Sequence, residues 1–166
     1  GMNAVYDHGH HGNALLSSFR IENSHNHDVS DHAYEQRGIL HCVLETPAGR
    51  VHCYVVHLGL FEGGRGRQTA QLIEAVQQSS HGEPVIIAGD FNDWRLKADA
   101  VLSRHLVEAF GKRCGALARS FPARLPLLRL DRIYLRNAVP EKAQVLSSYP
   151  WSHLSDHAPL AAEISL

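Results

Sequence analysis

Short polar motifs at the ends of apolar runs carry side chains that could act on a phosphate ester. Gly-Asp-Phe-Asn, Leu-Asp-Arg-Ile and Ser-Asp-His follow one another along the chain, and Val-Val-His precedes them. Together they supply carboxylates, a carboxamide and two imidazoles: Asp90, Asp131, Asp156, Asn92, His57 and His157. Such groups at strand ends are those needed for metal-assisted attack of water on a phosphorus centre.

The elements that must position these residues can be predicted from apolar periodicity and turn residues. Residues 39–45 and 51–57 are expected to form a hairpin, and residues 85–88 a buried strand. Further strands are expected at 14–18, 130–135, 143–148 and 159–164, helices at 67–79 and 96–109, and loops at 3–13, 22–36 and 111–129. Strands and helices mix along the chain, which favours a layered α/β (α+β) sandwich.

Length and composition limit the class of protein. The 166 residues, 44% of them hydrophobic, fit a single domain covering residues 1–166. A net charge of -1 gives no strong field for nucleic acid, and no apolar run could span a bilayer. Three cysteines without paired spacing indicate free thiols and a reducing, cytoplasmic location.

The order and wording of these motifs resemble the endonuclease/exonuclease/phosphatase superfamily, whose members share a DNase I-like fold. The resemblance covers the chain from about residue 12 onward, and residues 3–44 look like bacterial members of unassigned substrate. It implies a DNase I-like layered β-sandwich flanked by helices. It also implies a Mg²⁺- or Mn²⁺-dependent phosphodiesterase or phosphomonoesterase acting through in-line attack by water.

The resemblance also implies roles for individual residues. Asp90 would orient or deprotonate the water or hold a metal ion, and Asn92 would contact a phosphate oxygen or position that water. Asp156 would help to bind the metal, and His157, oriented by Asp131, would donate to the phosphate. His57 would be the second imidazole, Arg37 could hold a phosphate, and Arg65 and Gln68 would support the site from the helix entry.

Simpler interpretations accompany each motif. Gly-Asp and Asn-Asp are common turn residues, Ser-Asp can cap a helix, and a strand-end histidine or arginine is often only solvated. The histidines at positions 8, 10, 11, 25, 27 and 32 match no closed zinc pattern and are interpreted as solvated or substrate-facing loops. Basic residues at 113, 119, 124, 129 and 132 could form a local basic edge, although a solvated loop is the preferred interpretation.

The beginning of the chain departs from the family pattern. Members open with a strand ending in asparagine and then a Gln-Glu pair that supplies the principal metal-binding glutamate, whereas Glu22, Glu35 and Glu45 lie in other contexts. The chain is therefore expected to be the C-terminal two-thirds of the family fold, weakly active or inactive by itself. Its exposed sheet edge predicts self-association.

The substrate class stays open at this point. A small phosphoester, a lipid head group and a nucleic acid all suit the chemistry, and DNA endonuclease or exonuclease activity is the first specific alternative. The alternative of another class is a non-catalytic binding module, which the missing glutamate favours.

Overall fold

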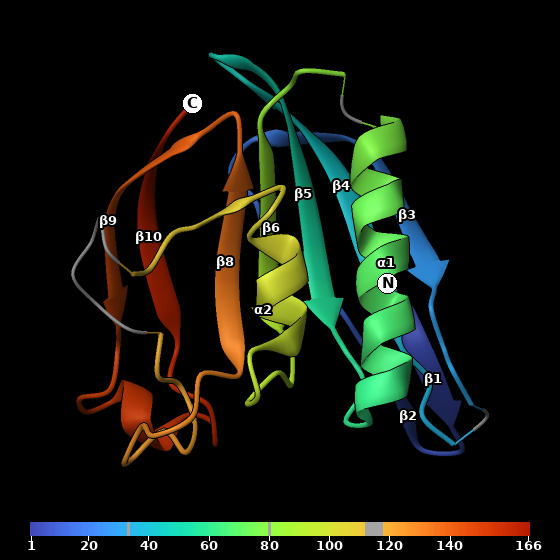
Figure 1. The fold of residues 1–166 in the computed structure, drawn as a ribbon, viewed down its shortest axis with the longest axis vertical. Coiled ribbons are helices and arrows are strands. Elements are labelled where there is room, and N and C mark those ends of the chain that lie inside the picture. The colour runs from blue at the N-terminus through green and yellow to red at the C-terminus, as the bar shows by residue number, and fades with distance from the viewer. Residues whose placement is uncertain (33, 80, 112–117) are drawn as a thin grey trace.

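A six-stranded sheet forms the middle layer of the molecule in the computed structural model, which describes residues 1–32, 34–79, 81–111 and 118–166 (Figure 1). Its order is β3-β4-β5-β6-β8-β7. The strands are β3 (Arg20–Asp28), β4 (Gly38–Thr46), β5 (Gly49–His57), β6 (Val85–Asp90), β8 (Asp131–Arg136) and β7 (Val107–Glu108). Strands β5 and β6 run parallel, and β8 lies antiparallel to β6.

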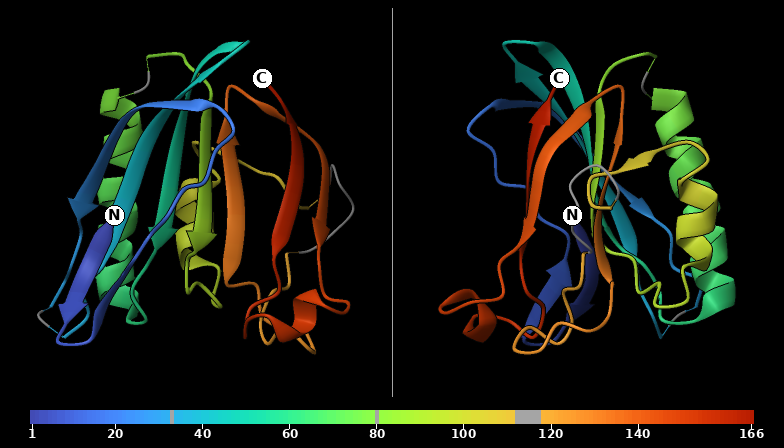
Figure 2. Two further views of the ribbon diagram at one scale, coloured as in Figure 1. Left: turned by 180° about the vertical axis from the view of Figure 1, so that it is seen from behind. Right: turned by 60° about the vertical axis from the view of Figure 1, so that its left-hand side comes forward.

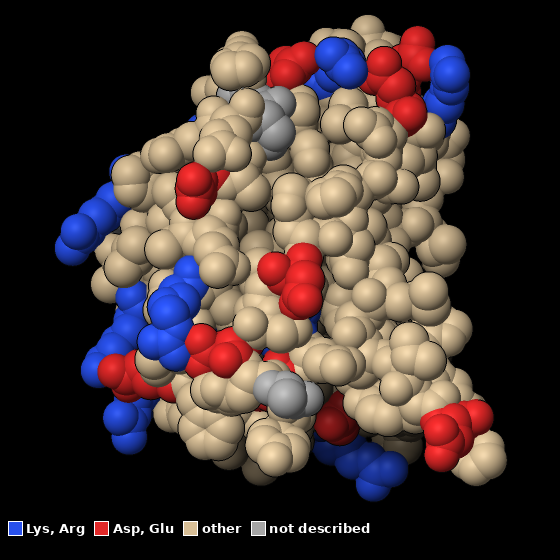
Figure 3. All heavy atoms as spheres, turned by 90° about the vertical axis from the view of Figure 1, so that its right-hand side faces the viewer, with Lys and Arg blue, Asp and Glu red and all other residues tan. Residues whose placement is uncertain are grey.

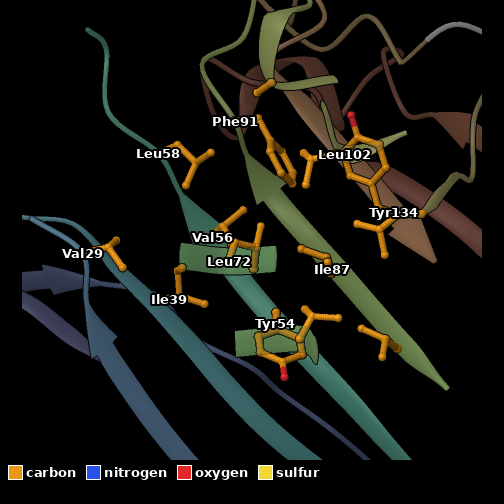
Figure 4. Close-up of a cluster of buried hydrophobic side chains, with 14 residues drawn as sticks. Val29, Ile39, Tyr54, Val56, Leu58, Leu72, Ile87, Phe91, Leu102 and Tyr134 are labelled. Carbon is orange, nitrogen blue, oxygen red and sulfur yellow. The ribbon is translucent and has the colours of Figure 1, made fainter. Parts of the chain in front are cut away.

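Two helices cover one face of this sheet. Helix α1 spans Glu62–Ser79 and α2 spans Lys97–Leu102. Between helices and sheet lies the larger core cluster, in which Leu72 of α1 meets Val56 and Ile87 of the strands and Phe91 packs edge-on against Tyr134 (Figure 4). Fully burying one such side chain contributes about 1.5–3 kcal/mol.

Two two-stranded sheets form the third layer on the opposite face, as the two views of Figure 2 show. One pairs β1 (Met2–Tyr6) with β2 (Gly9–Gly12), and the other pairs β9 (Val139–Val145) with β10 (Leu160–Ser165). A single 3₁₀ turn, η1 (Trp151–His153), lies between β9 and β10. The predicted class, a DNase I-like layered sandwich flanked by helices, is confirmed.

Several predicted boundaries are wrong. The hairpin and the strand at 85–88 are present, but residues 3–13 form most of the β1–β2 hairpin rather than a loop, and residues 14–18 form no strand. Strand β3 occupies much of the predicted loop at 22–36 because an edge strand needs no apolar face. Helix α1 begins at Glu62, before the expected 67, and the predicted helix at 96–109 shrinks to α2 followed by β7.

The predicted solvated basic loop needs a partial correction. Arg132 is fully buried, and its Nη1 lies 3.3 Å from Glu108 and 3.3 Å from Asp99, while Arg129 donates two hydrogen bonds to Glu108. These two arginines therefore share Glu108 in a partly buried ion-pair network at the start of β8. Arg113 and Cys114 lie outside the described residues. Cys42 and Cys53 face each other across β4 and β5 as free thiols.

A chain of hydrogen bonds links three titratable side chains on the helix-covered face. His52 Nε2 lies 2.9 Å from Glu83 Oε2, and His41 Nε2 lies 2.9 Å from His52 Nδ1. The His41 ring also stacks on Tyr54, with centroids 4.3 Å apart. Burial, followed by the neighbouring His52, lowers the pKa of His41 to about 4.

The low pKa of His41 predicts acid sensitivity. Between pH 6.5 and about 4 the unfolded chain binds a proton at His41 that the folded chain does not. The free energy of unfolding therefore decreases as the pH falls through this window. Below it, the whole contribution of His41 to stability has been lost. His41→Gln keeps a donor for His52 but cannot titrate. Thermal melts in EDTA should therefore show a shallower loss for His41→Gln, and equal slopes would contradict the assignment.

Candidate active site

Three polar residues stand in one row at the end of the central strands, at the lower end of the sheet in Figure 1. His57 ends β5, Asp90 ends β6 and Asp131 begins β8, and the register pairs His57 with Asp90 and Asp90 with Asp131. Parallel β5 and β6 place their carboxyl ends together, and antiparallel β8 starts at the same edge. Sheet register alone therefore brings together three residues that the sequence singled out.

His157 joins this row through Asp131. Its Nδ1 lies 2.6 Å from Asp131 Oδ2, and its ring centroid lies 5.0 Å from that of Phe121. Burial lowers the pKa of His157, but the hydrogen bond and charge of Asp131 outweigh it, so the pKa is raised overall. With Nδ1–H donated to the carboxylate, Nε2 is the nitrogen left to face a substrate.

His57 lies in the opposite electrostatic setting. Its Nε2 lies 3.5 Å from Asp90 Oδ2 and its Nδ1 lies 3.5 Å from Arg37 Nη1. Burial, then the positive charge of Arg37, lowers the pKa of His57 to about 4. The two imidazoles thus differ: the pKa of His57 is lowered, so this ring is neutral at pH 7, whereas the pKa of His157 is raised. Such divergent environments are typical of groups with different roles in one site.

Asp90 is held by the turn that follows β6. The Asn92 backbone N–H donates to Asp90 Oδ1 over 2.8 Å. Burial raises the pKa of Asp90, the Asn92 hydrogen bond opposes this, and the nearby Asp131 charge adds to it. Gly89 allows β5 to lie close to β6, because a Cβ at this position would lie only 2.0 Å from Val56 O. Its φ of +142° also favours glycine.

Asn92 does not continue the extended strand. Its φ is +48°, so the chain turns here, and its buried side chain donates through Nδ2 to Leu58 O over 2.9 Å. The simpler interpretation of Gly-Asp-Phe-Asn, a turn, therefore holds for the backbone at Asn92. In this conformation the amide nitrogen of Asn92 ties the β6–α2 turn to the end of β5.

Arg37 reaches the site from the start of β4 and is accompanied by a residue that sequence reasoning missed. Glu35 Oε1 accepts from Arg37 Nη2 over 3.1 Å and from Leu60 N over 3.0 Å. Arg37 Nε is buried without a hydrogen-bond partner in the structure. The spacing of Glu35 two residues before Arg37 is the one signal that could have indicated the pair.

Arg65 and Gln68 lie beneath the β5–α1 connection. Arg65 is buried, donates to Gly59 O and Leu60 O, and lies 5.1 Å above the Trp94 ring. Gln68 accepts from Gly59 N and donates to Val29 O. These contacts hold the chain that leaves His57.

Asp93 anchors the start of α2 and was not singled out from the sequence. It is fully buried and accepts from the backbone N–H groups of Lys97 and Asp99. Its Oδ1 lies 3.8 Å from Arg65 Nε, so the same arginine connects the two loops that follow β5 and β6.

Asp156 lies at the rim, on the segment that leads into β10. Its side chain is exposed and accepts from the Ser155 hydroxyl over 3.2 Å. Beside it a pocket of about 340 Å³ is lined by Gly89, Asp131, Ser155 and His157, among others. This pocket lies beside the Asp131–His157 pair and reaches Leu160 at the start of β10.

The donor set can be tested against a divalent metal. Asp90 and Asp156 offer hard oxygen ligands of the kind that Mg²⁺ and Mn²⁺ prefer. Within the described part of the chain, however, no group of three or more His, Cys, Asp or Glu side chains is arranged to hold a metal ion. The residues present fit such an ion in chemical type, and they supply only part of a ligand set.

Comparisons with known proteins show which family this chain resembles. A sequence model described as "Endonuclease/Exonuclease/phosphatase family" matches residues 2–157. The chain is 51% identical over 170 residues to uncharacterized protein YbhP of Escherichia coli K12 and to the Shigella flexneri protein of that name. The match spans all of this chain and 67% of each relative.

Solved structures share the fold. A family protein from Bacteroides vulgatus is 16% identical with a TM-score of 0.75, covering 89% of this chain and 66% of that one. One from Leptotrichia buccalis is 15% identical with a TM-score of 0.75, covering 100% and 70%. D. rerio TDP2, solved with a single-strand DNA product, is 17% identical with a TM-score of 0.65, covering 89% and 68%. No described helix has both the length and the apolar character needed to cross a membrane.

Proposed function

This chain belongs to the endonuclease/exonuclease/phosphatase family, and we propose that it is the major part of a divalent-metal-dependent phosphoesterase that hydrolyses a phosphodiester or phosphomonoester. The observation that carries the proposal is the Asp131–His157 pair at 2.6 Å, beside Asp90 in the same row of strand ends. A carboxylate base and a carboxylate-oriented imidazole donor are the two proton-handling groups that such a hydrolysis uses.

The proposed reaction proceeds by attack of water on phosphorus. Asp90 accepts the water proton as the new P–O bond forms and the bond to the leaving oxygen breaks. His157 Nε2–H donates to the charge that develops on the phosphate oxygens, and Asp131 keeps this imidazole oriented. Arg37 adds positive charge next to His57, which stays neutral.

A bound Mg²⁺ or Mn²⁺ would neutralise negative charge on the phosphate. Asp90 and Asp156 are the residues of this chain that would hold it. Because the chain spans 67% of its curated relatives and its described part holds no complete ligand cluster, we propose that the remaining ligands belong to a longer protein. The shorter chain should then be weakly active.

Hydrolysis of bis-p-nitrophenyl phosphate tests this proposal. We expect the protein extended to the length of its relatives to turn over with Mg²⁺ or Mn²⁺, to stop in EDTA and to recover when metal is restored. This chain alone should be much slower, and robust Mg²⁺-dependent turnover by it would refute the missing-ligand argument. If the longer protein cleaves neither this diester nor a panel of monoesters and nucleic acids, the binding-module alternative gains support.

Nuclease activity is the second candidate. Trp94 and Trp151 are partly exposed on the loops that follow β6 and precede β10, where they could stack on bases. The net charge of -1 argues against tight non-specific binding to nucleic acid. Cleavage of single-stranded DNA, lost in a Trp94→Ala variant that retains diester hydrolysis, would favour this candidate.

Self-association of this chain stays a prediction. Strand β3 is an edge of the central sheet, and most of its side chains are exposed. An unpaired strand edge offers backbone groups to a second chain. Sedimentation velocity should show dimers or larger species as concentration rises, and a monodisperse monomer at high concentration would contradict it.

A further inference from the structure

A second hollow, of about 490 Å³, lies on the helix-covered side of the sheet, between β3, β4 and α1. Its walls include His25, His27 and His41 from the strands and Glu74 from the helix, and none of its lining residues belongs to the candidate active site. Figure 3 shows this side of the molecule, where Lys and Arg lie mainly at the margins.

Strand geometry brings three imidazoles together here. His25 and His27 are two apart on β3 and therefore share a face, and the register places His25 opposite His41 of β4. The ring centroids of His25 and His27 lie 4.4 Å apart, and those of His27 and His41 lie 6.5 Å apart. Two imidazoles bound to one tetrahedral ion with metal–nitrogen bonds of about 2.1 Å have centroids about 5 Å apart.

The Glu83–His52–His41 chain fixes which nitrogen of His41 is free. In the tautomer in which His52 donates its Nε2–H to the Glu83 carboxylate, His52 Nδ1 is an acceptor. His41 must then donate its Nε2–H to His52 Nδ1, which leaves a lone pair on His41 Nδ1. Hydrogen bonds that orient a metal-binding imidazole are common around metal sites, and here His52, itself held by Glu83, makes that bond to His41.

The surroundings of two of these imidazoles are compatible with a metal ligand. Burial, then His25, lowers the pKa of His27, and burial and His52 lower that of His41. Both shifts favour neutral imidazole, the form that binds metals, but the proposal rests on the geometry of the three rings.

We propose that His25, His27 and His41 bind one transition-metal cation of the Zn²⁺ class, separate from the phosphoesterase site, with Glu83 and His52 orienting His41. Imidazole nitrogen selects such ions over Mg²⁺, which prefers oxygen. As placed in the structure, no three His, Cys, Asp or Glu side chains in the described part of the chain could hold a metal ion, and the His27 and His41 rings lie 6.5 Å apart. The β3 side chains must therefore rotate when the ion binds. The exposed position of His25 leaves room for that rotation.

Titration with Co²⁺, whose visible absorption reports coordination, tests the site in this chain, with excess Mg²⁺ present to occupy oxygen ligands. One Co²⁺ per chain should bind and be displaced by Zn²⁺. The double variant His25→Asn/His27→Asn should lose at least tenfold in affinity. The matched control His8→Asn/His10→Asn, which alters two exposed histidines of the β1–β2 hairpin, should bind as the wild type does.

Glu83→Gln tests the relay without removing a ligand. It should weaken Co²⁺ binding about tenfold or more, while circular dichroism and the thermal melt without metal stay close to those of the wild type. The proposal is overturned if wild-type Co²⁺ binding is undetectable, if the double variant binds as tightly as the wild type, or if the control pair loses binding instead.

Discussion

Replacing His157 with alanine is expected to lower kcat for phosphodiester hydrolysis by about 10²–10³-fold, the cost of removing one donor to developing charge. The imidazole is the only one in the described part of the site whose pKa is raised, and its Nδ1 is 2.6 Å from Asp131. His153→Ala is a matched control, since His153 is exposed and lies on η1. The assay uses the protein at the length of its relatives. Equal rates for both variants would remove His157 from the mechanism.

Asp131→Asn should act through His157. Without the negative charge, the pKa of His157 falls, so the imidazolium is lost at a lower pH than in the wild type. The alkaline limb of the pH–rate profile should therefore move toward lower pH in Asp131→Asn. A uniform loss of rate at every pH would indicate a purely structural effect instead.

Asp90→Asn is expected to be comparably severe, with kcat lowered by about 10²–10⁴-fold, because the amide can neither accept the water proton nor carry charge. The substitution preserves shape, and the amide oxygen can still accept the Asn92 N–H. Asp7→Asn, on the exposed β1–β2 turn, is the control. Turnover within a factor of about three of the wild type would exclude both roles proposed for Asp90.

Metal dependence separates the two roles of Asp90. If the carboxylate binds the ion, the Asp90→Asn variant should need a higher Mg²⁺ or Mn²⁺ concentration for half-maximal rate. If it acts only on water, the metal dependence should stay unchanged while the maximal rate falls.

The candidate site residues at the strand ends could be predicted from the sequence, because strongly apolar runs define where β5 and β6 end and where β8 begins. The register then had to place His57, Asp90 and Asp131 in one row, and the structure does so. The sequence left the turn at Asn92 open, because Gly-Asp-Phe-Asn is compatible with both an extended strand and a turn. Asn92 has a positive φ, and its side chain donates a hydrogen bond to the carbonyl oxygen of Leu58, which is far away in the sequence.

The polar elements could not be predicted in the same way. Strand β3 consists largely of polar residues and has no apolar pattern of its own. Its backbone pairing with β4 holds it in the sheet. The cluster of His25, His27 and His41 could not be predicted either, because the spacing of residues in the sequence does not show which residues are neighbours across two strands. Glu35 was missed for the opposite reason, since its importance rests on a local contact with Arg37 inside a segment that reads as loop.

The row of strand ends also has a consequence for biosynthesis. A ribosome delivers the N-terminal part of a domain first, so Arg37, His57 and Asp90 emerge well before Asp131. Strand β8 must then insert beside β6, and His157 must follow, before the row is complete. A nascent chain therefore carries no complete candidate site until both Asp131 and His157 have been synthesised and folded against β6.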